Sequence, residues 1–511
     1  MNGKGSAVDL TILVPRDHHI IAAAMIARFL LCIFLAFLFW DLRSVPAAEE
    51  ENSGECLLIS DIHFDPFADQ SLFSALAERP VSEWSRLLDS SLGSGVSQLG
   101  SDTNYVLLKS CLKAAAEKCP RPDFILYPGD SLAHNWRARY EKAASRSSSD
   151  NEEAYRKFTA KTIEFLALEL RKHFPAVPIL PALGNEDAYC GDYKIQPSGP
   201  FLEMFAHAWV DLPGPTLNRE SFESDFSRGG HYSMRIPPLF KHRVVVVNSV
   251  FFSSQYENSC GSESESPGEN EMAWLAATLD KARDAGESVW LMMHIPVGIN
   301  DYNTVKDEEA GTGPVEFWTR THTREFIDLL SKYRETVQIV FSGHTHMDDF
   351  RVIGTGQTPL VANKLVPSIS PIFRNNPGFQ VYQYDRISGV VRNYQTYYLS
   401  NLATAGRPTA LEQLEWKVEY DFRSAYGAEA MEVSDLTEIA RKLQTDTSIQ
   451  DHYMRYYSVS GPPAFDVRML PAYSCAILHT TIEEFEKCQN VADGGRSGKV
   501  DETERSFGVI E

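Results

Sequence analysis

The stretch CLLISDIHF, residues 56–64, decides the fold, because an apolar β-type run ends in it and two polar side chains follow directly. Four later runs have the same layout: FILYPGD (124–130), PILPALGN (178–185), VWLMMH (289–294) and TVQIVFSGHTH (336–346). Each run places oxygen or imidazole groups after a buried strand, and open α/β sheets build their sites at the carboxyl ends of strands. The pattern therefore predicts an α/β protein whose site lies at these strand ends.

The polar residues that follow these runs are all of metal-binding types, namely Asp61, His63, Asp130, Asn185, His294, His344 and His346. Taken singly, some have a structural alternative: Asp130 can cap a helix, Asn185 can occupy a turn, and His294 can be a core histidine. The pair His344 and His346 is the most specific element, since it presents two imidazoles at one strand end. The set exceeds what one tetrahedral ion takes, so it predicts two metal ions that share a carboxylate.

The composition favours a large folded domain and disfavours polyanionic partners. The chain has 511 residues with 43% hydrophobic and 11% aromatic content, which is enough for a sizeable core. Its 48 basic and 69 acidic residues give a net charge of −21, and a field of that sign repels nucleic acid and anionic membrane surfaces. We therefore expect no nucleic-acid binding, and an anionic substrate has to be captured locally by the metal ions.

The N-terminal part has the features of an export signal. Residues 29–40 (FLLCIFLAFLFW) are an apolar core preceded by Arg28, and cleavage after Ala47 or Ala48 fits the small residues that follow. We expect a signal peptide over residues 1–48; Met25 is an alternative start that would leave residues 1–24 upstream of the protein. An uncleaved membrane anchor over residues 19–40 is the alternative, although Arg28 interrupts it. Cleavage would make the mature protein periplasmic or secreted.

Export permits disulfides. Cys32 lies in the predicted signal, so seven of the eight cysteines remain and at least one is unpaired within the monomer. Three pairings are candidates, the first of them favoured: Cys475 with Cys488, Cys190 with Cys260, and Cys111 with Cys119. The absence of any Asn-x-Ser/Thr sequon favours a bacterial envelope over a glycosylated eukaryotic route.

Strand-like and helix-like stretches alternate from residue 56 to about 398. Helices are expected over residues 104–118, 153–173, 199–209, 271–285 and 323–333. A late group of strands, at 242–248, 349–353, 378–384 and 390–398, has the alternation of an antiparallel sheet. From residue 401 to 490 the strand-ending motifs stop and the pattern predicts a helical subdomain. Residues 491–511 are charged and contain several glycines, which is typical of a disordered tail.

Together these motifs resemble the calcineurin-like metallophosphoesterases, and within them the acid sphingomyelinase-like branch. The likeness covers about residues 56–490 and includes GDSLAHNW (129–136), MHIP (293–296), GHTHMDDF (343–350), PSIS (367–370), NPGFQVYQYD (376–385) and EWKVEY (415–420). It implies a four-layer α/β/β/α sandwich, with two packed mixed sheets flanked by helices, in a catalytic domain over residues 49–400. The helical C-terminal subdomain at 401–490 would follow it.

The resemblance divides the ligands between two divalent ions. The first ion would take Asp61, His63, Asp130 and His346, and the second would take Asp130, Asn185, His294 and His344. Position 133 is alanine, so the tyrosine by which purple acid phosphatases bind ferric iron is missing. A site rich in imidazole and without phenolate suits zinc, with manganese or iron as alternatives.

The resemblance also implies a mechanism and further roles. A hydroxide that bridges the two ions would attack phosphorus in line, without a protein nucleophile. His134 corresponds to a family histidine that faces the phosphate, where it would neutralise charge or protonate the leaving oxygen, or else support a metal ligand. Asp348 is expected to orient one of the neighbouring imidazoles. Most relatives have histidine where this chain has Glu186, which could act as a general acid if burial or acidic neighbours raise its pKa.

The expected substrate is a soluble or accessible phosphodiester or phosphoanhydride, such as a nucleotide derivative, a head-group diester or polyphosphate. Few residues separate the predicted cleavage point from residue 56, so the saposin-like lipid-handling domain of true acid sphingomyelinases is not expected; membrane contact stays open. Trp136, Tyr189 and Trp318 are candidates for an aromatic wall at the site, or else for the core. The alternatives are an endopolyphosphatase-like hydrolase and a metal-binding envelope protein with weakened catalysis.

Overall fold

A computed structural model of the protein describes residues 52–90, 95–144, 151–214, 217–236, 241–258, 260, 266–310, 313–355, 358–405 and 411–494. The predicted signal peptide at 1–48 and the predicted tail beyond residue 494 lie outside the described residues. Within the described ranges, no helix is both long enough and apolar enough to cross a membrane.

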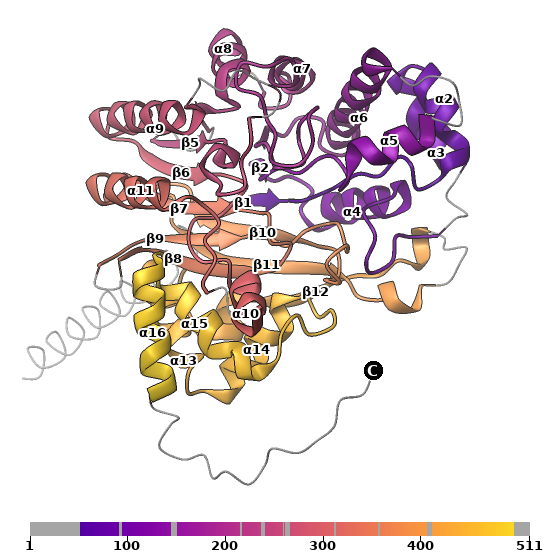
Figure 1. The fold of residues 1–511 in the computed structure, drawn as a ribbon. Coiled ribbons are helices and arrows are strands. Elements are labelled where there is room, and N and C mark those ends of the chain that lie inside the picture. Colours follow the sequence, from indigo (N-terminus) through magenta and orange to yellow (C-terminus); the bar gives the residue numbers. More distant parts are fainter. Residues whose placement is uncertain are drawn as a thin grey trace, which may run out of the picture. The chain divides into compact units, whose positions relative to one another are not determined.

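Two mixed six-stranded sheets form the centre of the fold, as expected (Figure 1). The first has the strand order β12-β11-β10-β1-β2-β3, with β1 to β3 parallel and β10 to β12 antiparallel. Its strands are β1 (Ser53–Leu58), β2 (Phe124–Tyr127), β3 (Ile179–Pro181), β10 (Gly378–Asp385), β11 (Val391–Leu399) and β12 (Trp416–Asp421).

The second sheet has the order β4-β5-β6-β7-β9-β8, in which β5, β6, β7 and β9 are parallel and the two outer strands are antiparallel. Its strands are β4 (Tyr232–Arg235), β5 (His242–Val246), β6 (Ser288–Met292), β7 (Val337–Ser342), β8 (Asp349–Thr355) and β9 (Thr358–Leu365). The four late strands exist, but the expectation of one antiparallel sheet is wrong: β5 and β8 belong here, and β10 and β11 belong to the first sheet. Alternation along a strand indicates which face is buried, not which strand is its partner.

Helices flank the sheets (Figure 1). The five expected helices are confirmed as α4 (Tyr105–Lys118), α6 (Glu152–His173), α7 (Pro200–Trp209), α9 (Pro267–Asp284) and α11 (Arg320–Lys332). The other α-helices among the described residues are α2 (Phe73–Glu78), α3 (Trp84–Asp89), α5 (Trp136–Ala144), α8 (Arg219–Gly229), α10 (Asp301–Ala310), α12 (Phe422–Tyr426), α13 (Val433–Lys442), α14 (Thr447–Tyr457), α15 (Leu470–Leu478) and α16 (Ile482–Gly494). Side-chain caps fix several starts; Thr319, for example, accepts a hydrogen bond from the N–H of His322 and begins α11 ahead of the expected residue 323.

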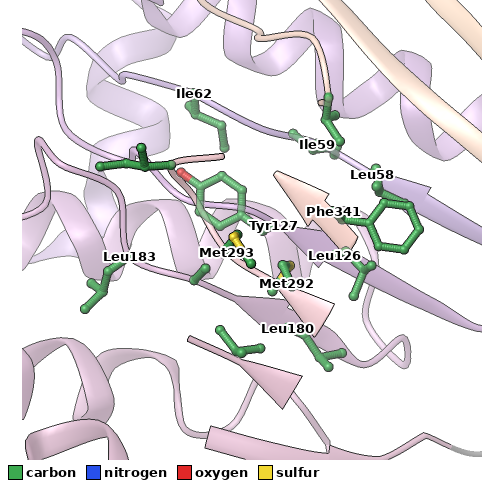
Figure 2. Close-up of a cluster of buried hydrophobic side chains, with 14 of the residues drawn as sticks. Leu58, Ile59, Ile62, Leu126, Tyr127, Leu180, Leu183, Met292, Met293 and Phe341 are labelled. Carbon is green, nitrogen blue, oxygen red and sulfur yellow. The ribbon is translucent and has the colours of Figure 1, made fainter. Parts of the chain in front are cut away.

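The two sheets pack face to face through aromatic side chains. The ring of Trp290 in β6 lies 5.6 Å from that of Phe124 in β2 and 5.3 Å from that of Tyr384 in β10, measured between centroids. Figure 2 shows another part of this core, in which Leu58 and Leu126 lie with the aromatic rings of Tyr127 and Phe341 in one cluster of buried side chains. Burying each such side chain stabilises the fold by about 1.5–3 kcal/mol, so the strand ends that carry the polar motifs rest on a rigid base.

The C-terminal region is mainly helical, but it also completes the first sheet. Strand β12 pairs with β11, while helices α13 and α15 pack against β8; Figure 1 shows these yellow helices beside that strand. Helix α16 continues to Gly494, so it takes in the first residues of the predicted tail. The domain boundary at residue 400 stays a prediction.

Two of the predicted disulfides are confirmed. Cys475 bonds to Cys488 and ties α15 to α16, and Cys190 bonds to Cys260 across a separation of 70 residues. The third candidate pair does not form: Cys111 and Cys119 are both free and buried, because helix α4 continues between them to Lys118.

Candidate metal centre

The ligand candidates occupy tight turns at the ends of β1, β2, β3, β6 and β7. Five of them have a left-handed backbone, with φ values of 49° at Asp61, 44° at His63, 57° at Asp130, 73° at His344 and 65° at His346. Such a conformation costs a non-glycine residue on the order of 1–3 kcal/mol and persists where the surroundings enforce it, most often at functional sites. Hydrogen bonds between neighbouring turns enforce it here, since the N–H groups of residues 61 and 63 donate to the carbonyls of residues 129 and 130 at 3.0 Å.

The first group consists of Asp61, His63, Asp130 and His346, which are all buried. The Nε2 atom of His63 lies 3.1 Å from Nε2 of His346 and 3.4 Å from Oδ2 of Asp130. Oδ1 of Asp61 lies 3.7 Å from the same His346 nitrogen. Four side chains from three strand ends therefore direct their ligand atoms to one point.

The second group consists of Asp130, Asn185, His294 and His344. Nε2 of His294 lies 3.0 Å from Oδ2 of Asp130 and 3.0 Å from Oδ1 of Asn185, and Nδ1 of His344 lies 2.8 Å from that amide oxygen. Oδ2 of Asp130 thus faces both groups, as a bridging carboxylate would. The position before Asn185 has to be glycine, because a Cβ on Gly184 would lie 2.0 Å from the Asp130 carboxylate.

Hydrogen bonds fix the tautomers of two of these histidines in the ligand form. Nδ1 of His63 lies 2.9 Å from the carbonyl of Leu132, and Nδ1 of His294 lies 3.0 Å from the carbonyl of Pro128, so both nitrogens donate. Their Nε2 atoms then face Nε2 of His346 in the first group, and carboxylate and amide oxygens in the second. In the second group, atoms this close need a positive charge between them, which a proton on His294 or a divalent ion supplies. The donor set of each group fits one divalent ion.

The pKa values agree with this interpretation. Burial and then neighbouring histidines lower the pKa of His63 to about 4 and that of His344 to about 3, so both are neutral at pH 7, which is the form that binds metal. Burial would raise the pKa of Asp130, but His294 and His63 bring it below its usual range. Burial would likewise lower the pKa of His294, yet Asp130 raises it to about 9. The second group therefore favours a positive charge at its centre.

His134 stands beside the first group and is held by a carboxylate that the sequence did not indicate. Its ring stacks on that of His63 with 4.0 Å between centroids. Nδ1 of His134 lies 2.9 Å from Oδ1 of Asp102, and the His134 N–H donates to Oδ2 at 3.0 Å. Arg139 donates to the same carboxylate and to Asp65. Asp102 lies in a loop without a preceding strand, so no spacing signal could reveal it.

Glu186 and Asp187 lie directly behind the second group. Glu186 is 4% exposed, and its N–H donates to Oδ1 of Asp130 at 2.9 Å. Burial, together with the nearby carboxylates of Asp192 and Asp130, raises the pKa of Glu186 to about 9. A raised pKa is what Glu186 needs in order to carry a proton as a general acid. Asp187 supports the ligand turns, since its carboxylate accepts hydrogen bonds from the N–H groups of Ser131 at 2.9 Å and of residue 184 at 3.0 Å.

Asp348 contacts neither imidazole. Its carboxylate pairs with the fully buried ammonium of Lys364 and accepts hydrogen bonds from Gln380 at 2.9 Å, Thr396 at 2.7 Å and Tyr420 at 3.0 Å. The expected bond to His344 or His346 is thus missing from the described residues. A buried ammonium needs a carboxylate partner, and Asp348 provides it while joining the turn after β7 to β9, β10, β11 and β12.

The aromatic residues beside the site are not the three that the sequence suggested. Trp136, Tyr189 and Trp318 are 2%, 6% and 0% exposed and pack in the core, which was the alternative interpretation. Tyr193 instead approaches the second group, with its Oη 3.3 Å from Nε2 of His344. Phe373 lies edge-on to His134 and His346, with 5.5 and 4.6 Å between ring centroids. Neither follows a strand, so both were missed.

Comparison with protein families identifies the fold and the chemistry together. Residues 56–348 match the family described as calcineurin-like phosphoesterase, a range that includes every ligand candidate. The chain belongs to the calcineurin-like phosphoesterase family. Residues 357–490 also match the family described as the acid sphingomyelin phosphodiesterase C-terminal region. The protein is therefore a metallophosphoesterase-family hydrolase, and the resemblance to the acid sphingomyelinase-like branch is confirmed.

Named relatives support the same branch. The chain is 27% identical to acid sphingomyelinase-like phosphodiesterase 3b of Mus musculus, over 76% of this chain and 80% of the relative. It is 25% identical to sphingomyelin phosphodiesterase A of Dictyostelium discoideum, over 86% and 69% of the two chains. It is 24% identical to a cyclic GMP-AMP phosphodiesterase of Rattus norvegicus, over 91% and 99%. All three names describe phosphodiesterases.

Proposed function

We propose that the protein is an exported phosphodiesterase that binds two divalent metal ions, with Asp130 shared between them. The observation that carries the proposal is the position of Oδ2 of Asp130, 3.4 Å from Nε2 of His63 and 3.0 Å from Nε2 of His294. One carboxylate oxygen that faces an imidazole of each ligand group has the position of a carboxylate that bridges two cations. The imidazole-rich donor set favours zinc over manganese or iron.

The proposed ligand sets are those implied by the family resemblance. Asp61, His63, Asp130 and His346 would hold the first ion, and Asp130, Asn185, His294 and His344 would hold the second. When bound, two such ions supply Lewis acidity for a phosphoryl oxygen and lower the pKa of a water molecule toward neutrality.

The other residues of the site would bind and protonate the substrate. Hydrolysis forms a bond from a water oxygen to phosphorus and breaks the bond to the leaving oxygen, which then needs a proton. We assign that proton to His134, because Asp102 holds Nδ1 at 2.9 Å and leaves Nε2 as the ring nitrogen that can donate. Glu186 takes the place of a family histidine and would act as a neutral hydrogen-bond donor behind Asp130.

The substrate would be a small phosphodiester. The names of the relatives include sphingomyelin and cyclic GMP-AMP, so the proposal covers head-group diesters and nucleotides, and a phosphoanhydride such as polyphosphate fits the same chemistry. Export is supported by the two disulfides, which form in oxidising compartments.

Metal content and turnover test the proposal together. The purified protein is analysed for metal and assayed with bis-p-nitrophenyl phosphate, beside His344→Ala and the matched control His207→Ala, a histidine that is exposed on α7. We expect two metal equivalents and turnover in the wild type and in the control, and loss of turnover with one equivalent in His344→Ala. Metal without turnover on this ester, on nucleotides, on sphingomyelin and on polyphosphate would favour a metal-binding envelope protein, and no metal after reconstitution would refute the site.

A further inference from the structure

Phe373 is a large apolar side chain that stays exposed although it touches the metal centre. It is 52% exposed. Its ring nevertheless lies 4.6 Å from that of His346, a ligand candidate, and 5.5 Å from that of His134, at interplanar angles of 73° and 86°. Of the six large hydrophobic side chains that are exposed among the described residues, Phe373 alone has ring contacts with imidazoles of the site. The ring of Phe373 therefore lies at the exposed edge of the first ligand group.

The loop that carries Phe373 is fixed to the site. Phe373 lies within a tight turn, which is closed by a 3.0 Å hydrogen bond from the N–H of Arg374 to the carbonyl of Pro371. The stem of the loop bonds to the ligand turns themselves: the N–H of Ser370 donates to the carbonyl of Asp61 at 3.1 Å. The side chain of Asn375, which is fully buried, donates to Ser368 and to the loop carbonyls. The ring is thus pre-positioned, which lowers the entropic cost of binding a ligand against it.

Arg374 gives the same turn a positive charge. It is exposed and has a left-handed backbone with φ of 70°. A half-exposed ring that is followed in sequence by an exposed arginine suits a planar base that is linked to phosphate groups, because bases stack on aromatic rings and on guanidinium planes alike. It does not suit a quaternary ammonium group, which an aromatic ring attracts but an adjacent cation repels.

We propose that Phe373 and Arg374 bind the nucleoside side of the substrate, so that this phosphodiesterase prefers nucleotide esters to phosphocholine esters. The proposal rests on the proposed function and narrows its substrate class. Phe373 stacks on the base, Arg374 faces the phosphate side, and the phosphorus lies at the metal centre beside His134. Both residues act as specificity determinants and take no part in bond breaking.

Three esters with one leaving group test the assignment: the p-nitrophenyl esters of thymidine 5′-phosphate, of ethyl phosphate and of phosphocholine. The variants are Phe373→Ala, Phe373→Leu, Phe373→Tyr and Arg374→Gln. Ile387→Ala serves as the matched control, since Ile387 is 70% exposed in the turn between β10 and β11. Binding of thymidine 5′-monophosphate to the metal-loaded protein is measured in parallel by calorimetry.

Stacking of one base on an aromatic ring corresponds to about a tenfold change in affinity or more. We expect Phe373→Ala and Phe373→Leu to raise KM for the thymidine ester about tenfold, with kcat and the KM of the ethyl ester nearly unchanged, and Phe373→Tyr to restore the wild-type value. Arg374→Gln should lower KM for the phosphocholine ester about threefold, as expected for an exposed charge. Ile387→Ala should change none of these values.

The two proposals fail in different ways. Equal effects of Phe373→Ala on all three esters, or an unchanged KM for the thymidine ester, would overturn the assignment of Phe373 while leaving the phosphodiesterase intact. Absence of turnover on every ester would refute the phosphodiesterase. In that case calorimetry still decides: tenfold weaker nucleotide binding in Phe373→Ala supports the nucleoside site, and unchanged binding overturns it.

Discussion

Replacing Asp102 by asparagine tests whether the carboxylate beside His134 serves protonation of the leaving group. The two side chains meet through the 2.9 Å contact at Nδ1, and the carboxylate also accepts the His134 N–H at 3.0 Å. Asparagine keeps the size but removes the charge that favours the protonated ring. A hydrogen bond to a charged group contributes about 1.5–3 kcal/mol, which corresponds to a loss of about tenfold to 150-fold in kcat if the bond matters only in the transition state.

The leaving group decides where this loss appears. p-Nitrophenolate departs without a proton, whereas the alkoxide released from a dinucleotide needs one. We therefore expect Asp102→Asn to lower kcat for a dinucleotide by one to two orders of magnitude, and for bis-p-nitrophenyl phosphate by about threefold or less. Steady-state kinetics on both substrates, with metal content measured on the same samples, gives the comparison.

Asp65→Asn is the matched control. Asp65 binds the other side of the same guanidinium, with Nη1 of Arg139 at 2.7 Å from its Oδ2, and makes no bond to His134. Equal losses on the two substrates in Asp102→Asn, or the same leaving-group dependence in Asp65→Asn, would show that Asp102 only supports its loop. The role of His134 as the proton donor would then be refuted as well.

Three further outcomes follow from the geometry. Tyr193→Phe removes the hydroxyl that holds Nε2 of His344. It should lower the affinity for the second metal ion about tenfold or more, measured in competition with a chelator, and leave the affinity for the first ion unchanged. An equal loss of affinity for both ions would contradict this. Lys364→Met leaves the buried carboxylate of Asp348 without its ammonium partner. The free energy of unfolding, measured by urea titration, should fall by about 3–5 kcal/mol. A loss below about 1 kcal/mol would show that water reaches the pair. Chelation of the metal ions should abolish turnover and lower Tm, both reversibly on adding zinc, because opposed ligand atoms are left without a cation; an unchanged Tm would argue against bound metal in the folded protein.

The fold and the gathering of the candidate ligands could be predicted because their signals are local. An apolar run that is followed by Asp61 and His63, or by the two histidines at 344 and 346, predicts both the strand and the polar side chains at its carboxyl end. The five helices carried their own apolar periodicity, so their existence was predicted and only their ends shifted. Sheet membership had no such signal, which is why strands β5 and β8 were placed with the wrong partners.

Sequence alone determined which residues are the candidate metal ligands of this protein, because residue type and position after a strand are enough to select them. Tertiary structure decided which groups surround that chemistry. Asp102, Tyr193 and Phe373 reach the site from loops, and Asp348 turns away from the imidazoles toward the buried Lys364. These contacts join segments far apart in the chain, and their energies depend on burial and on which partner is closest. A one-dimensional pattern contains neither quantity, so the packing of the two sheets and their loops had to supply them.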